Sequence, residues 1–366
     1  MKAFAKLFVL ILLVVFSVNL LANPKVEMAI LLDTSGSMEG LIEQAKSQLW
    51  QIVNELAISK RDGQPIDLYI ALYEYGKDSI PESEGYIRMI VPLSQDLDKI
   101  SEELFVLKTN GGNEYCGRVI QSAVNSLQWS EDNNDLKLIF IAGNEPFTQG
   151  KIKYKDACQK AIENGIIVNT IFCGDFQEGI DTFWKDGADL ADGKYMNIDH
   201  NMQLVQIDAP QDEELFQLSQ ALNDTYIAYG IEGEMYKERQ EEQDSNALSM
   251  GGGTYAARTM SKSSAQYKNT QWDMVDAEEE GAVNLQEIPE DQLPEEMKNM
   301  SLKERKAYVE EKAAERKRIQ EKITQISAER EKYITQERAK LNEKSLDSVI
   351  IDAIHEQAAK KNYKFE

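Results

Sequence analysis

Short apolar segments alternate with amphipathic segments of helical length from residue 26 to about residue 230. The run 26–32 is apolar almost throughout, as in a strand that is buried on both faces, and the segment 40–56 repeats apolar residues at helical spacing. Further strands are predicted at 66–75, 86–91, 138–142, 166–173 and 194–198, and further helices at 97–107, 116–129, 154–164, 179–190 and 212–228. This order predicts a doubly wound α/β domain with a mostly parallel sheet and helices on both faces.

The pattern changes after residue 230. We predict a linker or irregular region over 231–300, with a hinge at Gly251–Gly253 and an acidic, proline-containing segment near its end. Residues 301–366 form a mainly helical region, which starts with a long charged helix that lacks Gly and Pro as far as residue 345. That helix either packs along one side of the domain or forms a coiled coil, and a terminal helix near 348–359 follows it.

The N-terminus has the composition of an export signal. Two lysines precede an apolar run at 7–15, and Ala22 provides a small residue for cleavage. We therefore expect residues 1–22 to be a signal peptide and residues 23–230 to be the α/β domain of a periplasmic or secreted protein. In the alternative interpretation the segment is not cleaved and anchors the protein in the inner membrane.

Charge and missing motifs exclude several classes of function. The chain has 40 Lys and Arg against 63 Asp and Glu, a formal net charge of -23, which would repel the phosphates of a nucleic acid. The two histidines, His200 and His355, lack the partners of a zinc site, and no nucleophile elbow accompanies them. A phosphate-binding glycine loop is also missing from the sequence. We therefore predict that the protein is not an enzyme.

The first strand runs directly into Asp33-Thr34-Ser35-Gly36-Ser37. Ligands of a doubly wound sheet bind where loops leave the carboxyl ends of the strands. In such a loop the alternate residues Asp33, Ser35 and Ser37 can face one point, and their hard oxygen ligands suit Mg²⁺ or Mn²⁺. From these residues alone, the alternative is a strand-to-helix turn whose serines cap the next helix.

The segment 26–38, which reads VEMAILLDTSGSM, resembles the opening of a von Willebrand factor type A domain. Its Asp-x-Ser-x-Ser element is similar to the first metal-ion-dependent adhesion site motif of that family. The resemblance covers about residues 26–230 and implies a Rossmann-like fold and a protein-binding module. It also implies that Ser35 and Ser37 bind a divalent ion directly, that Asp33 acts through water, and that a carboxylate of a protein partner completes the coordination.

Two further segments resemble the family less closely. The sequence GGNE, which ends at Glu114, is similar to the second motif, where Asn113 or Glu114 would be the ligand; the alternative is a glycine turn that leads into the next helix. In LIFIAGNEP, Gly143 occupies the position of the family's third-motif aspartate, and Asn144 or Glu145 is the substitute that would act through water. The segments EYCG, AGNEPF and FCG resemble an exported bacterial subgroup with a degenerate adhesion site.

The three cysteines, Cys116, Cys158 and Cys173, would lie toward the ligand-facing edge of the sheet. An oxidising compartment permits one disulfide, and we expect Cys173 to pair with Cys158 or Cys116. The alternative is three buried thiols that pack as small apolar side chains.

Two functions of different classes fit this sequence. The first is an extracytoplasmic protein-binding module in which Asp33, Ser35 and Ser37 hold a divalent ion for a partner. The second is a metal-independent scaffold protein of the cell envelope, which interacts through its C-terminal helical region beyond residue 296. Membrane contact is expected only if the N-terminal segment is retained.

Overall fold

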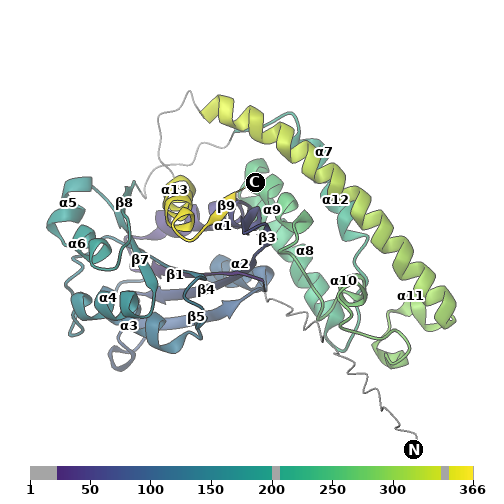
Figure 1. Ribbon diagram of the computed structural model, residues 1–366, viewed down its shortest axis with the longest axis horizontal. Helices are drawn as coiled ribbons and strands as arrows, with labels where there is room; N and C mark the ends of the chain where they lie inside the picture. The colour runs from purple at the N-terminus through teal and green to yellow at the C-terminus, as the bar shows by residue number, and fades with distance from the viewer. Residues whose placement is uncertain (1–22, 200–206, 339–345, 366) are drawn as a thin grey trace, which may run out of the picture.

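The computed structural model describes residues 23–199, 207–338 and 346–365, and its centre is a twisted six-stranded sheet (Figure 1). The strand order is β5-β4-β1-β6-β7-β8, and every neighbouring pair is parallel except β4 and β5. The strands are β1 (Lys25–Asp33), β4 (Asp67–Tyr75), β5 (Ile87–Ser94), β6 (Leu136–Gly143), β7 (Ile166–Cys173) and β8 (Tyr195–Ile198). The predicted mostly parallel, doubly wound sheet is therefore confirmed.

Helices cover both faces of the sheet because its central strands are buried on both sides. One face packs against α1 (Glu39–Ala57), α2 (Leu97–Val106), α7 (Asp212–Asn223), α9 (Gly252–Ser263) and α13 (Leu346–Ala359). The other face packs against α3 (Cys116–Ser126), α4 (Tyr154–Glu163) and α6 (Trp184–Asp189). Alternation along each strand explains the two cores, since successive side chains point to opposite faces.

Three local predictions differ from the structure. The helix predicted at 179–190 is two short helices, α5 (Phe176–Asp181) and α6, because Phe183 between them adopts a left-handed conformation with φ 73°. The predicted helix at 212–228 ends at Asn223. A small antiparallel sheet of β2 (Ser59–Arg61), β3 (Gln64–Pro65) and β9 (Tyr363–Phe365) was not predicted, because its strands are too short to show a hydrophobic period.

Much of the segment 231–300, for which the sequence predicted a linker or irregular region, is helical, whereas most of its acidic, proline-containing stretch at 280–294 is irregular. The segment contains α8 (Gly233–Ser249), α9, α10 (Met274–Glu279) and α11 (Glu295–Lys298). The charged residues of this segment are typical of an exposed linker, but several of them are buried in ion pairs. Arg258 Nη2 lies 2.7 Å from Asp98 Oδ1, and Lys262 Nζ lies 2.5 Å from Asp244 Oδ2. The predicted hinge is the tight junction between α8 and α9, where Gly251 has φ 117°.

The long helix α12 (Leu302–Arg338) packs on α7, α9 and α10 of its own chain. Its buried side includes Val309, Arg316, Ile323 and Arg330, which recur every seven residues. The two arginines do not interrupt this seam: Arg316 Nη1 lies 2.6 Å from Asp273 Oδ2, and Arg330 Nε lies 2.6 Å from Asp212 Oδ1. The sequence left open whether this helix packs along the domain or forms a coiled coil, and in the structure it packs along the molecule.

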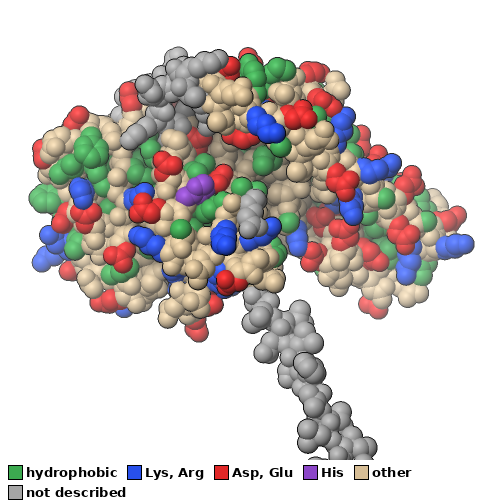
Figure 2. Space-filling view, turned by 45° about the horizontal axis from the view of Figure 1, so that its top comes forward, with side chains coloured by type: hydrophobic (Ala, Val, Ile, Leu, Met, Phe, Trp, Pro, Cys, Tyr) green, Lys and Arg blue, Asp and Glu red, His purple; other side chains and the backbone are tan. Residues whose placement is uncertain are grey.

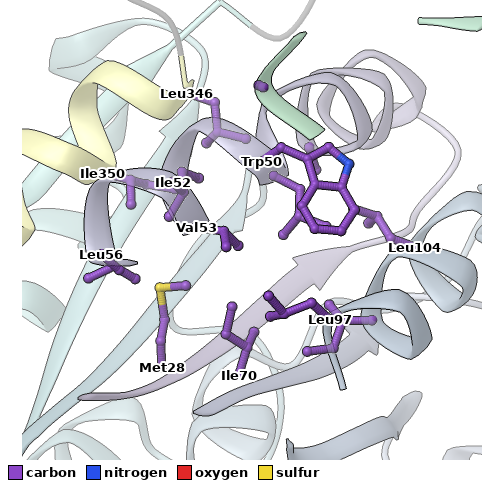
Figure 3. Close-up of a cluster of buried hydrophobic side chains, with 14 of the residues drawn as sticks. Met28, Trp50, Ile52, Val53, Leu56, Ile70, Leu97, Leu104, Leu346 and Ile350 are labelled. Atoms are coloured by element: carbon purple, nitrogen blue, oxygen red, sulfur yellow. The ribbon is translucent and has the colours of Figure 1, made fainter. Parts of the chain in front are cut away.

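The chain returns to the α/β domain at its C-terminus. Helix α13 lies beside α1, and Figure 3 shows Leu346 and Ile350 pointing toward Ile52 of α1. Its Gln357 exchanges amide hydrogen bonds with Asn169 of β7, and β9 pairs with β2. The helices from α8 to α12 thus form an insertion between two parts of one packed unit.

Acidic and basic side chains are intermingled over the face of the molecule that Figure 2 shows, so no broad field of one sign covers it. The predicted signal peptide, His200 and the end of the predicted long helix lie outside the described residues. Within the described ranges, no helix is both long enough and apolar enough to cross a membrane.

The position of α13 predicts a large effect of a mutation near the end of the chain. Ile354 is fully buried in the main core, so Ile354→Ala should lower the free energy of unfolding by about 2–5 kcal/mol. The exposed neighbour Asp352 provides the control, and Asp352→Ala should change it by less than about 0.5 kcal/mol. Urea denaturation measures both variants, and equal midpoints would show that α13 is not part of the core.

Candidate functional site

The loop after β1 brings the first predicted residues together at the carboxyl edge of the sheet. Asp33 ends the strand and is fully buried, and its Oδ1 accepts a hydrogen bond from the backbone N–H of Ser35 at 2.7 Å. The hydroxyl oxygens of Ser35 and Ser37 lie 3.3 Å apart. Alternate residues of the loop therefore face one point, as the sequence predicted, although Ser37 is exposed and Ser35 is buried.

Asn144 joins this group from the loop after β6. Its side-chain Nδ2 donates to Ser37 Oγ at 3.3 Å, across the neighbouring strand ends. The parallel pairing of β1 with β6 produces this contact, because their carboxyl ends meet at the same edge. Asn144 is therefore placed beside the first motif.

Glu114 reaches the same point from the loop before α3. Its carboxyl group lies within hydrogen-bonding reach of Asp33 and of Ser35, and the residue is 4% exposed. The adjacent Asn113 is exposed, and no described contact joins it to this group. Of the two residues that the sequence left open in this loop, Glu114 is the one that the fold places at the site.

Backbone contacts join the loop that carries Glu114 to the loop after β1, and join that loop in turn to the end of β4. The N–H of Asn110 donates to Thr34 O at 2.9 Å, and the N–H of Thr34 donates to Tyr75 O at 2.8 Å. Gly112 is required by a close approach, since a Cβ there would lie 2.5 Å from the carbonyl oxygen of Gly76. The loops after β1 and β4 therefore hold the third loop against them.

Tyr75 and Gly143 shape the floor of the site. The Tyr75 hydroxyl donates to Ala142 O at 2.9 Å, and a Cβ on Gly143 would lie only 2.4 Å from the Tyr75 oxygen and 3.0 Å from Asp33 Oδ2. The space of a side chain at position 143 is therefore filled by Tyr75 and Asp33. The sequence did not predict Tyr75 as a site residue. Its position at the end of the strand next to β1 is the feature that could have indicated it.

Three buried oxygen atoms in this group have no hydrogen-bond partner: Asp33 Oδ2, Glu114 Oε2 and Asn144 Oδ1. Buried acceptors without a partner are rare because each one costs free energy. The nearby cations do not neutralise the two carboxylates, since Lys77 and Arg88 both pair with Glu74 instead. The site is thus rich in acceptors and poor in donors.

This arrangement raises the pKa of both acids. Burial is the main cause for Glu114, and the neighbouring Asp33 adds to it, so that the pKa of Glu114 rises to about 10. Burial likewise raises the pKa of Asp33 to about 6. Without a cation, the pair therefore retains a proton at neutral pH, because two adjacent buried carboxylates cannot both be charged at low cost.

The donor set fits a hard divalent cation. Carboxylate and hydroxyl oxygens are ligands that such ions prefer, and both kinds converge here, with the Asn144 amide beside Ser37. In the described part of the chain, no group of three or more His, Cys, Asp and Glu side chains could hold a metal ion. The set at Asp33 differs from such groups because it has two acids, and neutral oxygens supply the rest.

The predicted disulfide is not present. Cys116, Cys158 and Cys173 are all buried free thiols, which is the alternative that the sequence left open. The reason is the two-residue period of β7: Cys173 belongs to the core on the α1 side of the sheet, whereas Cys158 and Cys116 belong to the core on the α3 side. Burial raises the pKa of each thiol.

The raised pKa values predict how the stability of the metal-free protein depends on pH. Burial and the neighbouring Asp33 raise the pKa of Glu114 in the folded state, so the folded protein keeps a proton on this pair at pH values where the unfolded chain, with the ordinary pKa of 4.5, has released it. This contribution is therefore fully present at acid pH and is lost as the pH rises, by at most about 1.4 kcal/mol per pH unit. In the presence of chelator, Glu114→Gln should flatten this decline between pH 5 and 9.

Urea denaturation across this pH range measures the effect. The exposed acid Glu131 provides the control, and Glu131→Gln should keep the wild-type slope. If Glu114→Gln had the same slope as the wild-type protein, Glu114 would not carry the proton.

Comparisons with solved structures find several chains that are similar to this one over about half of its length. BatB from Bacteroides thetaiotaomicron is 17% identical, with a TM-score of 0.36, over 48% of this chain and 90% of that chain. The SpRpn10 VWA domain is 16% identical, with a TM-score of 0.37, over 49% and 90%. An aerotolerance-related membrane protein from Bacteroides fragilis is 18% identical, with a TM-score of 0.31, over 48% and 92%. No curated protein matches this chain.

The family comparison covers the strands and loops that build the site. The model of the von Willebrand factor type A domain matches residues 27–216, from β1 to the first turns of α7. This range includes every residue of the cluster at Asp33 and just over half of the chain. The chain therefore belongs to the von Willebrand factor type A domain family.

Proposed function

We propose that this protein is a metal-assisted, extracytoplasmic protein-binding module. Domains of its family are commonly interaction modules rather than enzymes. The observation that carries the proposal is the convergence of Asp33, Ser35, Ser37 and Glu114 at one edge of the sheet, with buried acceptor oxygens left unpaired. A divalent ion such as Mg²⁺ or Mn²⁺ would supply the positive charge that this set lacks.

Each residue of the site would have its own role in holding the ion. The hydroxyls of Ser35 and Ser37 would hold the ion, and Asn144 orients Ser37 through its amide. Asp33 and Glu114 would provide the negative charge from beneath, since both are buried. Ser37 lies on the exposed side, so a partner can approach the ion from there.

Export supports the same proposal. The lysines and the apolar run at the N-terminus are typical of a signal peptide, and the net charge of -23 does not suit nucleic acid as a partner. A protein partner in the periplasm or outside the cell is the corresponding expectation. If the N-terminal segment is retained, the same domain would act at the surface of the inner membrane.

Titration with Mg²⁺ or Mn²⁺ tests the proposal. Calorimetry should detect binding to the wild-type protein, and the double variant Asp33→Ala, Ser35→Ala should lose about 10–100-fold in affinity because it loses a carboxylate and a hydroxyl ligand. Asp175 provides a matched control, since it follows β7 at the same edge but only caps α5. Asp175→Ala should bind the ion as the wild-type protein does.

A pull-down from envelope extract, with and without chelator, extends this test to the partner. The proposal expects capture that needs both the ion and the intact Asp33 loop. Capture by the double variant at the wild-type level in chelator would contradict it.

A second candidate is the metal-independent scaffold, and the exposed face of α12 favours it. This 37-residue helix packs along one side only, and residues such as Lys317, Arg318 and Glu321 face solvent. Deletion of everything beyond residue 296 is not a clean test, because it also removes α13 and β9 from the α/β unit.

Charge reversal on α12 separates the two functions. If α12 were the docking surface, Lys317→Glu with Arg318→Glu should reduce partner capture by about tenfold or more, since opposite charge would face the partner. Chelator would then have no effect on capture. The metal-assisted function expects the opposite pattern in the same pull-down, with loss in chelator and normal capture by the charge-reversed variant.

A further inference from the structure

Glu114 supplies a carboxylate where the third motif lacks one. Gly143 leaves no acid at the end of β6. The structure brings Glu114 to Asp33 from a different loop, so two buried acids lie beside the serines, and the charge of a third acid, the half-buried Glu145, acts on both. The acid that is missing at the end of β6 is replaced by one from the loop between α2 and α3.

The position of Glu114 is imposed by the loops and not by a flexible side chain. The loop is tied to the first motif through Asn110 and Thr34, and Gln149 Oε1 accepts a hydrogen bond from the Glu114 N–H. A Cβ on Gly76 would lie 2.8 Å from the Glu114 Cγ, so the stem of the side chain is also packed. Glu114 is therefore held over Asp33 in advance of any ligand.

Gly143 and Tyr75 explain why the second acid has to come from this loop. The Tyr75 hydroxyl already occupies the space that a side chain at position 143 would need, and it is anchored to Ala142 O. A carboxylate at position 143 would collide with Tyr75 and would lie against Asp33 Oδ2. The second acid therefore comes from the loop that carries Glu114.

Charge balance then decides what a partner can offer. Two buried carboxylates match the two positive charges of a divalent ion, which Mg²⁺ sites in proteins commonly show with one or two acids. A third carboxylate, brought by a partner, would leave one uncompensated negative charge in a buried site, and such charges are costly. A carbonyl, amide or hydroxyl oxygen brings no such cost.

From this arrangement we infer that Glu114 acts as an internal carboxylate ligand and that the loaded site takes its partner through a neutral oxygen. The inference rests on the proposed metal-assisted function and revises the expectation of a partner carboxylate. The partner would present a backbone carbonyl, an amide side chain or a hydroxyl over Ser37. Glu114 is then the residue that sets the specificity of the site.

Binding of Mn²⁺ in the presence and absence of acetate tests this inference, with acetate as the probe for a partner's carboxylate. Electron paramagnetic resonance measures free Mn²⁺, and water proton relaxation reports the water molecules on bound Mn²⁺. For the wild-type protein, acetate should change neither quantity. Glu114→Thr should bind Mn²⁺ about 10–100-fold more weakly. Acetate should then strengthen binding and displace water, because one acid is missing.

Asp175→Asn is the matched control, because Asp175 follows β7 at the same edge of the sheet but only caps α5. It should keep wild-type Mn²⁺ affinity within about threefold and should remain insensitive to acetate. Thermal melts of all three proteins in chelator show that each is folded. The full chain is used throughout, since α13 and β9 belong to the same packed unit.

Three results would overturn the inference, and they are distinguishable. Equal Mn²⁺ affinity of the wild-type and Glu114→Thr proteins would remove Glu114 as a ligand but would leave the proposed function in place. Acetate binding to the loaded wild-type protein, as strong as to the variant, would restore the partner carboxylate. Absence of Mn²⁺ binding by the wild-type protein would remove both the inference and the proposed function.

Discussion

Asp33 and Glu114 come from distant parts of the chain, and their carboxylates lie next to each other in one buried site. Asp33 ends the first strand and Glu114 precedes a helix on the other side of the sheet, and folding brings them within hydrogen-bonding reach. Like charges in a buried place oppose folding unless a proton or a cation compensates them. The loops of the sheet edge must therefore be held firmly enough to keep the pair together, and much of the surrounding structure serves that end.

The elements that form this rigid scaffold are not consecutive in the chain. The first strands and helices form the α/β unit, a long helical insertion follows, and α13 and β9 then complete the unit from the C-terminus. Buried ion pairs attach the insertion: Arg330 of α12 pairs with Asp212 of α7, and Arg258 of α9 pairs with Asp98 of α2. Removing one partner of such a pair is strongly destabilising, so the insertion is a fixed part of the molecule.

At this site the sequence follows the family pattern in the first motif and departs from it at Gly143. The first motif could be predicted because Asp33, Ser35 and Ser37 are consecutive alternate residues, and local geometry directs them to one point. The missing acid at Gly143 suggested a weaker site. That conclusion considered one strand end at a time, whereas the structure has Tyr75 filling the vacant space and a second acid entering from another loop.

The sequence by itself determined the alternation of strands and helices, the parallel sheet and the first motif, because these depend on hydrophobic period and on neighbours in the chain. Only the tertiary structure decided that Glu114 rather than Asn113 joins the site, that Cys173 faces away from Cys158, and that the charged segment 231–300 packs as helices. Each of these depends on contacts between residues far apart in sequence, such as Asn110 with Thr34, which no local pattern contains.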